Sequence, residues 1–120
     1  MFGTILEDAV TGVKGAVAAI LMGFDGIPVD TFQVANSEED IETIGMEFSV
    51  LLKEVKKAAE ALETGLATEM SVQTDAMSIV LRIISDEYFL AIAIRNNGNL
   101  GKARYLLRIA APKINEALTE

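Results

Sequence analysis

This sequence lacks the residue types from which most catalytic centres are built. The chain of 120 residues contains no cysteine and no histidine. It therefore lacks the usual ligands for zinc and copper, any disulfide, and the commonest general base near pH 7. Glu38 and Glu42 lie one helical turn apart, but a solvated helix end does not give two carboxyls the different environments that acid–base catalysis needs. We expect no catalytic residue, no metal, no cofactor, and a protein that is not an enzyme.

A glycine-containing segment, Gly98-Asn99-Leu100-Gly101-Lys102, lies where a strand is expected to pass into a helix. Backbone N–H groups at such a junction can hold an anion. The spacing matches neither a Walker loop nor a dinucleotide-binding Gly-x-Gly-x-x-Gly. The simpler interpretation is favoured, in which 96–99 form a turn and Asn99 caps the helix.

Charged residues are unevenly distributed along the chain. The net charge is −8, which argues against non-specific binding to nucleic acid. Acidic residues gather between Ser37 and Glu69, whereas residues 95–113 contain no acid. This basic segment is either a docking surface for an acidic partner or anionic lipid, or a solvated face that balances the acidic helix, and the second interpretation is favoured. Its basic residues are Arg95, Lys102, Arg104, Arg108 and Lys113.

Turn residues and hydrophobic periodicity predict most of the elements that position these groups. A capping box at Thr4 predicts a first helix that ends near Lys14. The last helix contains Pro112, which would kink it or end it early, and Arg82 interrupts a strand near the edge of the sheet. The other predicted elements are a hairpin of 16–22 and 27–34 that turns at Asp25-Gly26, a three-strand meander of 69–74, 77–84 and 88–94, and a last helix of 99–118.

Between the hairpin and the meander, residues 36–67 predict one long helix capped by Asn36 or Ser37. A helix of about 30 residues is about 45 Å long, which exceeds the length of any strand in this chain. The helix should therefore extend beyond the sheet, and another surface should cover it. Its expected buried stripe consists of Ile41, Ile44, Phe48, Leu51, Leu52, Val55, Ala59, Leu62 and Leu66.

The apolar content of the strands predicts their order in the sheet. The first and fifth strands are apolar on both faces and belong in the middle of the sheet. The expected fold is therefore α+β, with a five-stranded antiparallel sheet of order 2-1-5-4-3 and helices on both of its faces. The third strand is then an open edge that a two-fold partner would complete. We therefore expect a homodimer, in which Gly45 and other small residues of the long helix allow another helix to approach. The predicted interface consists of Met70, Val72 and Thr74 on the strand and Ala58, Ala61 and Gly65 on the helix.

This order of elements resembles the Roadblock/dynein light chain family, whose domains have a profilin-like fold. Two segments carry the resemblance: Gly15 to Met22 with Asp25-Gly26-Ile27-Pro28-Val29, which is similar to the family's first hairpin, and 97–104, which is similar to its entry into the last helix. The resemblance covers residues 1–120 as a single domain. It implies a homodimer with one continuous sheet across paired third strands and with the long helices side by side.

The resemblance also implies a function. Members of bacterial or archaeal type act as regulators or scaffolds for small Ras-like GTPases, and the gliding-motility regulators among them accelerate GTP hydrolysis. The first alternative is a structural adaptor subunit in a motor or polarity complex. The second, less favoured, is a sensor domain for a small ligand.

The outward face of the long helix is the expected surface for such a partner, because apolar side chains exposed among charges are typical anchors of an interface. The residues are Met46, Val50, Lys53, Glu54 and Lys57. The helix contains no arginine, so any stimulation of hydrolysis should act by ordering the switch loops of the GTPase.

The longest uncharged stretch, 15–24, is too short to cross a bilayer, and no basic region precedes an apolar run at the N-terminus. We therefore expect a cytoplasmic protein that does not insert into membranes.

Overall fold

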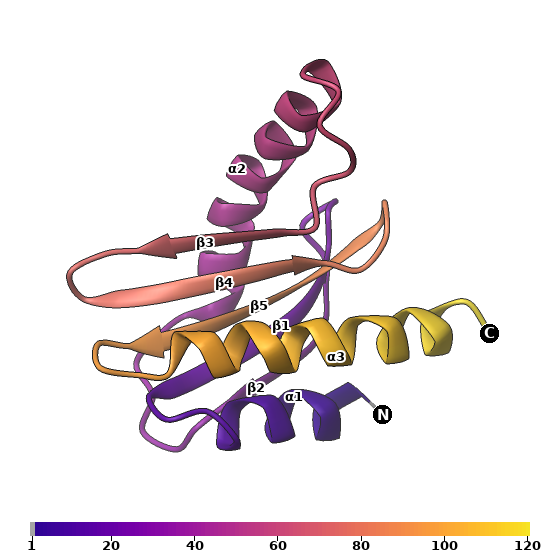
Figure 1. Cartoon of the computed structure of the whole chain (residues 1–120). Coiled ribbons are helices and arrows are strands. Elements are labelled where there is room, and N and C mark those ends of the chain that lie inside the picture. Colours follow the sequence, from indigo (N-terminus) through magenta and orange to yellow (C-terminus); the bar gives the residue numbers. More distant parts are fainter. Residues whose placement is uncertain (1) are drawn as a thin grey trace.

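The computed structural model describes residues 2–120 and confirms the predicted order of helices and strands (Figure 1). The elements are α1 (Phe2–Thr11), β1 (Ala16–Gly23), β2 (Pro28–Gln33), α2 (Ile41–Ala61), β3 (Glu69–Gln73), β4 (Met77–Ile83), β5 (Tyr88–Arg95) and α3 (Leu100–Leu118).

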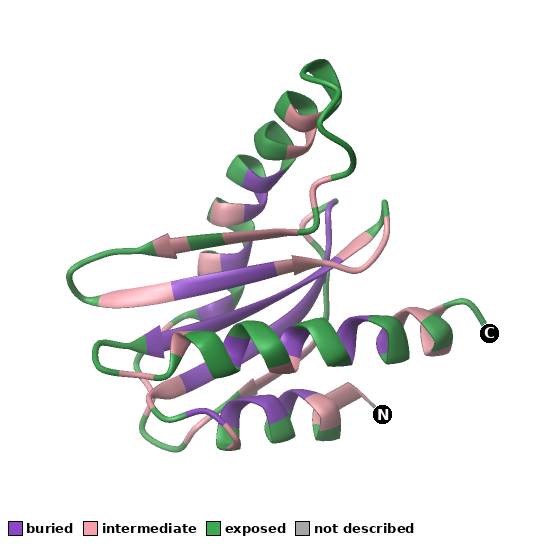
Figure 2. Cartoon of the chain, viewed as in Figure 1, coloured by how far each residue is buried: buried purple, intermediate pink, exposed green. Residues whose placement is uncertain are grey.

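The five strands form one antiparallel sheet in the order β2-β1-β5-β4-β3, as predicted. β1 and β5 are buried almost throughout and lie in the middle, whereas the edge strand β2 carries Pro28, which cannot donate a backbone hydrogen bond (Figure 2). Helices α1 and α3 cover one face of the sheet and α2 crosses the other (Figure 1).

Each face of the sheet has its own hydrophobic core, because successive side chains of a strand point to opposite faces. On the α1 and α3 side the core includes Leu6, Val10, Leu21, Leu90, Ile92, Leu107 and Ile114. On the α2 side it includes Ile20, Met22, Ile41, Leu52, Ile79, Leu81 and Phe89.

The predicted bounds of the first helix are wrong at both ends. α1 already contains Phe2 and Gly3, so Thr4 lies inside the helix and does not cap it. The helix ends at Thr11, where the backbone tightens: Gly12 N still donates to Asp8 O, but Val13 N donates to Val10 O, three residues back.

The predicted bounds of the long helix are also wrong. Asp40 is the N-cap, and its carboxylate accepts from Thr43 N at 3.1 Å. Asn36 has a φ of 65°, a left-handed conformation that cannot continue into a helix. At the other end Glu63 has a φ of 56°, and α2 stops at Ala61. With 21 residues the helix is about 32 Å long, not about 45 Å.

Acid should weaken the start of α2. Hydrogen bonds from Thr43 hold the pKa of Asp40 below its usual 3.8, and a hydrogen bond from the Ser37 hydroxyl, with the Arg95 guanidinium, holds the pKa of Glu39 below 4.5. A carboxyl with a depressed pKa stabilises the fold above its unfolded pKa, and this contribution is lost as pH falls through its folded pKa. Urea unfolding should show the wild type more stable than Asp40→Asn near pH 6, with the gap narrowing as pH falls below the usual Asp pKa of 3.8 and through the folded pKa of Asp40. A gap that does not change with pH would contradict this account.

Only the first half of α2 packs on the sheet. The buried residues of α2 are Ile41, Gly45, Ser49 and Leu52, and none follows Leu52. The second half projects past β3, so the helix extends beyond the sheet despite its shorter length (Figure 1). The predicted buried stripe is therefore wrong in part, because its exposed members are Leu51, Val55, Leu62 and Leu66. Gly45 faces β1, where a Cβ would lie 3.3 Å from the sulfur of Met22, and does not face another helix.

The connections α1–β1 and β5–α3 touch through two glycines. Gly15 has a φ of 85°, and a Cβ added to it would lie 2.8 Å from the Cα of Gly98. Beside this contact Asn99 N donates to Lys14 O at 3.0 Å. The structure confirms that Asn99 caps α3, because its side chain accepts from Lys102 N at 3.0 Å. Pro112 does not end α3, which continues to Leu118.

Candidate functional site

The outer face of α2 and the turn between β1 and β2 together form an exposed apolar surface. Met46 and Val50 are 49% and 56% exposed, and Ile27 in the turn is 64% exposed. Helix and turn lie next to each other, since a Cβ on Gly26 would be 3.9 Å from Met46 Cγ. Between them lies a hollow of about 400 Å³. We call the residues that line this hollow, together with Ile27, the α2–turn surface. The hollow is lined by Phe24, Asp25, Gly26, Met46, Glu47, Ser49, Val50 and Lys53.

Local hydrogen bonds hold the turn in place. The Asp25 carboxylate accepts from Ile27 N at 3.1 Å, and Gly23 N donates to Ile27 O at 2.9 Å. Phe24 anchors the turn to the sheet and to α2. The centre of its ring lies 5.1 Å from that of Phe89 on β5, and Lys56 Nζ of α2 lies 4.2 Å from the centre of the Phe24 ring. Ile27 is therefore presented to solvent by a turn that is fixed on the sheet.

The residues predicted to bind a partner divide into two groups. Met46, Val50 and Lys53 line the hollow, whereas Glu54 and Lys57 do not. These two pair with each other at 3.4 Å on the exposed side of α2. Sequence reasoning missed the contribution of the turn. The signal in the sequence was Ile27, an apolar residue directly after the Asp25-Gly26 turn. Nothing in the neighbouring sequence indicates that α2 lies next to this turn.

The residues predicted for the dimer interface lie on β3 and at the end of α2. Met70 and Val72 are half-buried on β3. The Thr74 hydroxyl is engaged within the β3–β4 turn, where it donates to Met77 O at 2.9 Å. Ala58 and Ala61 lie on α2, but Gly65, with a φ of 101°, follows the helix and is not part of it. Within the chain as described, the outer edge of β3 has no neighbouring strand.

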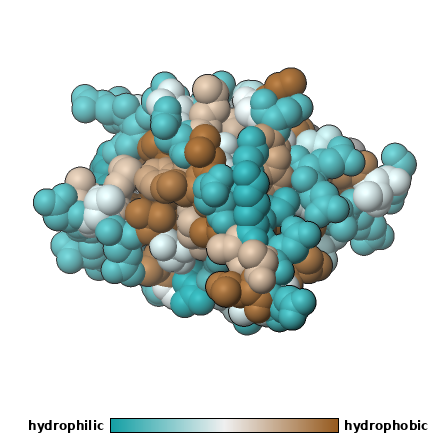
Figure 3. Space-filling model, turned by 90° about the horizontal axis from the view of Figure 1, so that it is seen from above, coloured by the Kyte–Doolittle hydropathy of each residue, from teal (hydrophilic) through white to brown (hydrophobic). Residues whose placement is uncertain are grey.

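Exposed apolar residues also gather at the projecting end of α2. Leu51, Val55 and Leu62 recur at helical spacing on one side of the helix, and Leu66 follows in the loop at 94% exposure. Seen from above, the molecule shows apolar patches among hydrophilic side chains (Figure 3). Soluble monomeric proteins rarely expose contiguous apolar surface of this kind, and such surface is typical of an interaction site.

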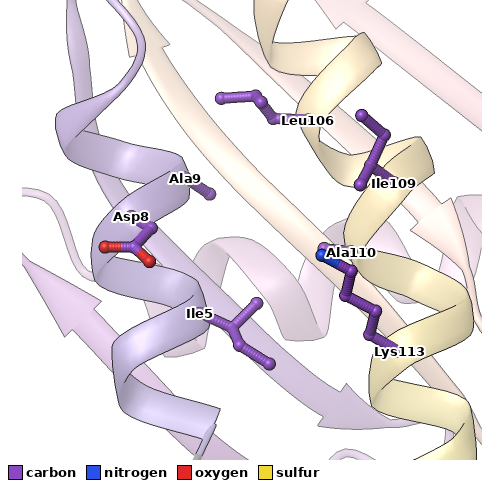
Figure 4. Close-up of a pocket in the computed structure, with 7 residues that line it drawn as sticks. All are labelled: Ile5, Asp8, Ala9, Leu106, Ile109, Ala110 and Lys113. Carbon is purple, nitrogen blue, oxygen red and sulfur yellow. The ribbon is translucent and has the colours of Figure 1, made fainter.

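A groove between α1 and α3 is an alternative site with a largely apolar lining. Its wall residues include Ile5 and Ala9 on α1 and Leu106 and Ile109 on α3, with Asp8 and Lys113 beside them (Figure 4). The groove holds about 170 Å³, which is below the usual size of a small-molecule pocket. It therefore does not favour the small-ligand sensor.

Neither a metal-binding cluster of side chains nor a membrane-spanning helix is found in the part of the chain that the structure describes. Residues 2–120 contain no cluster of three or more side chains suited to hold a metal ion. In the same stretch, no helix combines the length and the apolar character needed to span a membrane.

Several proteins of known structure are similar to this chain. No protein-family model and no curated protein sequence matches the chain. Among solved structures, MglC from Myxococcus xanthus is 45% identical, with 97% of this chain and 98% of that chain covered and a TM-score of 0.70. A Roadblock/LC7 domain from Streptomyces avermitilis superposes with a TM-score of 0.86 at 13% identity, covering 98% of each chain.

A third structure has a similar fold. The gliding protein MglB from Thermus thermophilus superposes with a TM-score of 0.82 at 16% identity, covering 94% of this chain and 84% of that chain. At such identities the Roadblock/LC7 domain and MglB show the fold alone, whereas the identity with MglC extends over nearly the whole of both chains. The chain therefore belongs to the Roadblock/LC7 family, as a relative of MglC with the profilin-like fold expected from the sequence.

Proposed function

We propose that this protein is a homodimeric regulator or scaffold that binds a small Ras-like GTPase through the α2–turn surface. The observation that carries the proposal is an exposed apolar surface on a Roadblock/LC7 domain that is 45% identical to MglC. Two structurally similar proteins are MglB proteins, and the one from Thermus thermophilus is a gliding protein.

The composition of the α2–turn surface favours a protein partner. Ile27, Met46 and Val50 supply apolar contact area, and Lys53 and Glu47 lie at its margin. Apolar anchors within a polar rim are typical of protein interfaces. The turn is held by Phe24 and Asp25, so a partner would bind a preformed surface and little order would have to be gained on binding.

The dimer would form on two features that the chain leaves uncovered. One is the open edge of β3, and the other is the exposed stripe of Leu51, Val55 and Leu62 on the projecting half of α2. Pairing β3 with β3 of a second copy would extend the sheet across a two-fold axis. It would also bring the projecting helices together, so that each covers the other's stripe.

Regulation of the GTPase would not involve an arginine finger on this surface. α2 contains no arginine, and its cations are Lys53, Lys56 and Lys57. Lysine lacks the planar fork with which arginine stabilises a phosphoryl group in the transition state. The protein would instead hold the partner's own switch loops in the arrangement that hydrolysis requires.

The test uses purified small Ras-like GTPases encoded in the source genome, each loaded with GDP or with a non-hydrolysable GTP analogue. We expect one of them to bind the wild-type protein in isothermal titration calorimetry. The variant Met46→Asp/Val50→Asp should lower the affinity about 10²-fold or more, because it places two charges in the apolar centre of the contact.

The control is Ile109→Asp, which introduces one negative charge at an exposed apolar residue of α3 on the other side of the sheet. It should bind as the wild type does. Equal loss of affinity in both variants would remove the α2–turn surface from the proposal. Binding that is indifferent to the bound nucleotide would favour the structural adaptor.

A further inference from the structure

Three arginines gather around one glutamate on the face of the sheet that α3 covers. Glu69 of β3 lies opposite Arg82 of β4 in the strand register, and Arg104 reaches it from α3. The distance from Arg104 Nε to Glu69 Oε2 is 2.7 Å, and that from Arg82 Nη1 to Glu69 Oε1 is 3.7 Å. Arg108 follows Arg104 one helical turn later. We call these four residues the arginine cluster.

The arginine cluster surrounds a hollow of about 390 Å³. Three arginines and one glutamate give the lining a net charge of +2, in a chain whose net charge is −8. Among residues 2–120 no carboxylate lies within ion-pair distance of Arg108, whose guanidinium is 5.4 Å from the ring of Tyr105. The complete lining is Thr68, Glu69, Arg82, Gly101, Arg104, Tyr105 and Arg108.

Arg82 shows that the positive charge of the cluster is not fully compensated. Its side chain is only 20% exposed, and its Nε is enclosed without a hydrogen-bond partner in the described chain. Among residues 2–120 the one carboxylate within ion-pair distance of Arg82 is that of Glu69, and it makes its shorter contact with Arg104. A largely buried guanidinium with so few partners is costly, and an additional anion in the hollow would reduce that cost.

We propose that the arginine cluster is a second docking site, which binds an acidic segment of a partner protein. Arg104 and Arg108 are spaced about 6 Å apart along α3, so they can meet successive carboxylates of a peptide. Tyr105 is 51% exposed between them and offers an apolar contact. Arginine and tyrosine are among the residue types that are enriched where binding energy concentrates at protein interfaces.

A protein segment fits this site better than a membrane surface does. The hollow is recessed between β4 and α3, and Arg82 lies at its base with little exposure. A flat layer of lipid headgroups would reach exposed cations, but Lys113 lines the groove on the α1 side of α3 and so lies apart from the cluster. The cluster also lies across the sheet from the α2–turn surface, so the two sites can be tested separately.

Fluorescence anisotropy with a labelled synthetic peptide of glutamates and one leucine tests the proposal. We expect the peptide to bind at low salt, and we expect its affinity for the protein to fall steeply as the salt concentration rises. The variants Arg108→Glu and Arg104→Glu/Arg108→Glu should lower its affinity about tenfold or more. Arg108→Glu leaves the contacts of Glu69 intact, and a thermal melt of each variant checks that the fold persists.

Two controls define the site. Lys113→Glu makes the same change of charge on the same helix, and it should bind the peptide as the wild type does. Met46→Asp/Val50→Asp should also bind it unchanged, which separates this proposal from the proposed function. The proposal would be overturned by equal loss in Lys113→Glu, by equal binding of a glutamine peptide, or by wild-type binding to phosphatidylserine vesicles or inorganic phosphate without binding to the glutamate peptide.

Discussion

A Ser71→Pro variant should sediment as a monomer of 12.9 kDa, whereas the wild type should sediment near twice that mass. The strand register decides the position of the proline. Thr74 N donates to Met77 O, and Thr68 O accepts from Ile83 N, so the even-numbered residues of β3 bond to β4. Since the bonding direction alternates along an antiparallel strand, Ser71 directs its N–H to the open edge.

The second half of this experiment addresses the exposed stripe of α2. Leu62→Asp would place a charge where a second copy is expected to cover the helix, and it should raise the dimer dissociation constant about 10²-fold, or about 2.7 kcal/mol. Ile109→Asp is the matched control and should remain dimeric. Val72→Pro is not equivalent to Ser71→Pro, because it would break a bond to β4 within the chain. If both Ser71→Pro and Leu62→Asp still sediment as dimers, the interface lies elsewhere.

Gly98→Ala should destabilise the fold by about 3 kcal/mol, which is a large part of the stability of a domain of this size. The added Cβ would lie 2.2 Å from Ile94 Cγ2, 2.7 Å from Lys14 O and 3.0 Å from Arg95 O. Two of these atoms belong to the backbone, so the two connections that meet at Gly15 and Gly98 would have to separate. Urea unfolding followed by circular dichroism measures the loss.

Gly101→Ala is the control for this substitution. It lies in the first turn of α3, where the nearest atom to a Cβ is Asn99 Oδ1 at 3.8 Å. Alanine favours a helix over glycine by about 0.5–1 kcal/mol, so this variant should be as stable as the wild type or more so. A loss for Gly101→Ala that equals the loss for Gly98→Ala would show that crowding at the crossing is not the cause.

The sheet could be predicted from the sequence because its order depends on local properties. Strands that are apolar on both faces, such as β1 and β5, belong in the middle, and the short connections allow few other topologies. The ends of α2 could not be predicted in this way. Asn36, Ser37 and Asp40 are all good caps, and the choice depends on backbone angles that packing determines.

The buried stripe of α2 shows a second limit. Leu51, Val55 and Leu62 have the spacing of a core-facing stripe, yet they are exposed in the single chain. Periodicity reports which side chains avoid water, but not whether a residue of the same chain or of another copy covers them. The contribution of Ile27 to the candidate site was missed for a related reason, because the turn meets α2 only in the folded protein.

The two hydrophobic cores have no fully buried residue in common, because neighbouring residues of the central strands alternate between them: Leu21 belongs to one, Ile20 and Met22 to the other. Substitutions on distant sites without shared partners have nearly additive effects on stability. Changes that adapt the α2 face to a new partner should therefore leave the packing under α1 and α3 almost undisturbed. The sheet separates the two faces into independently variable units, so that each can diverge by mutation without compensating changes in the other.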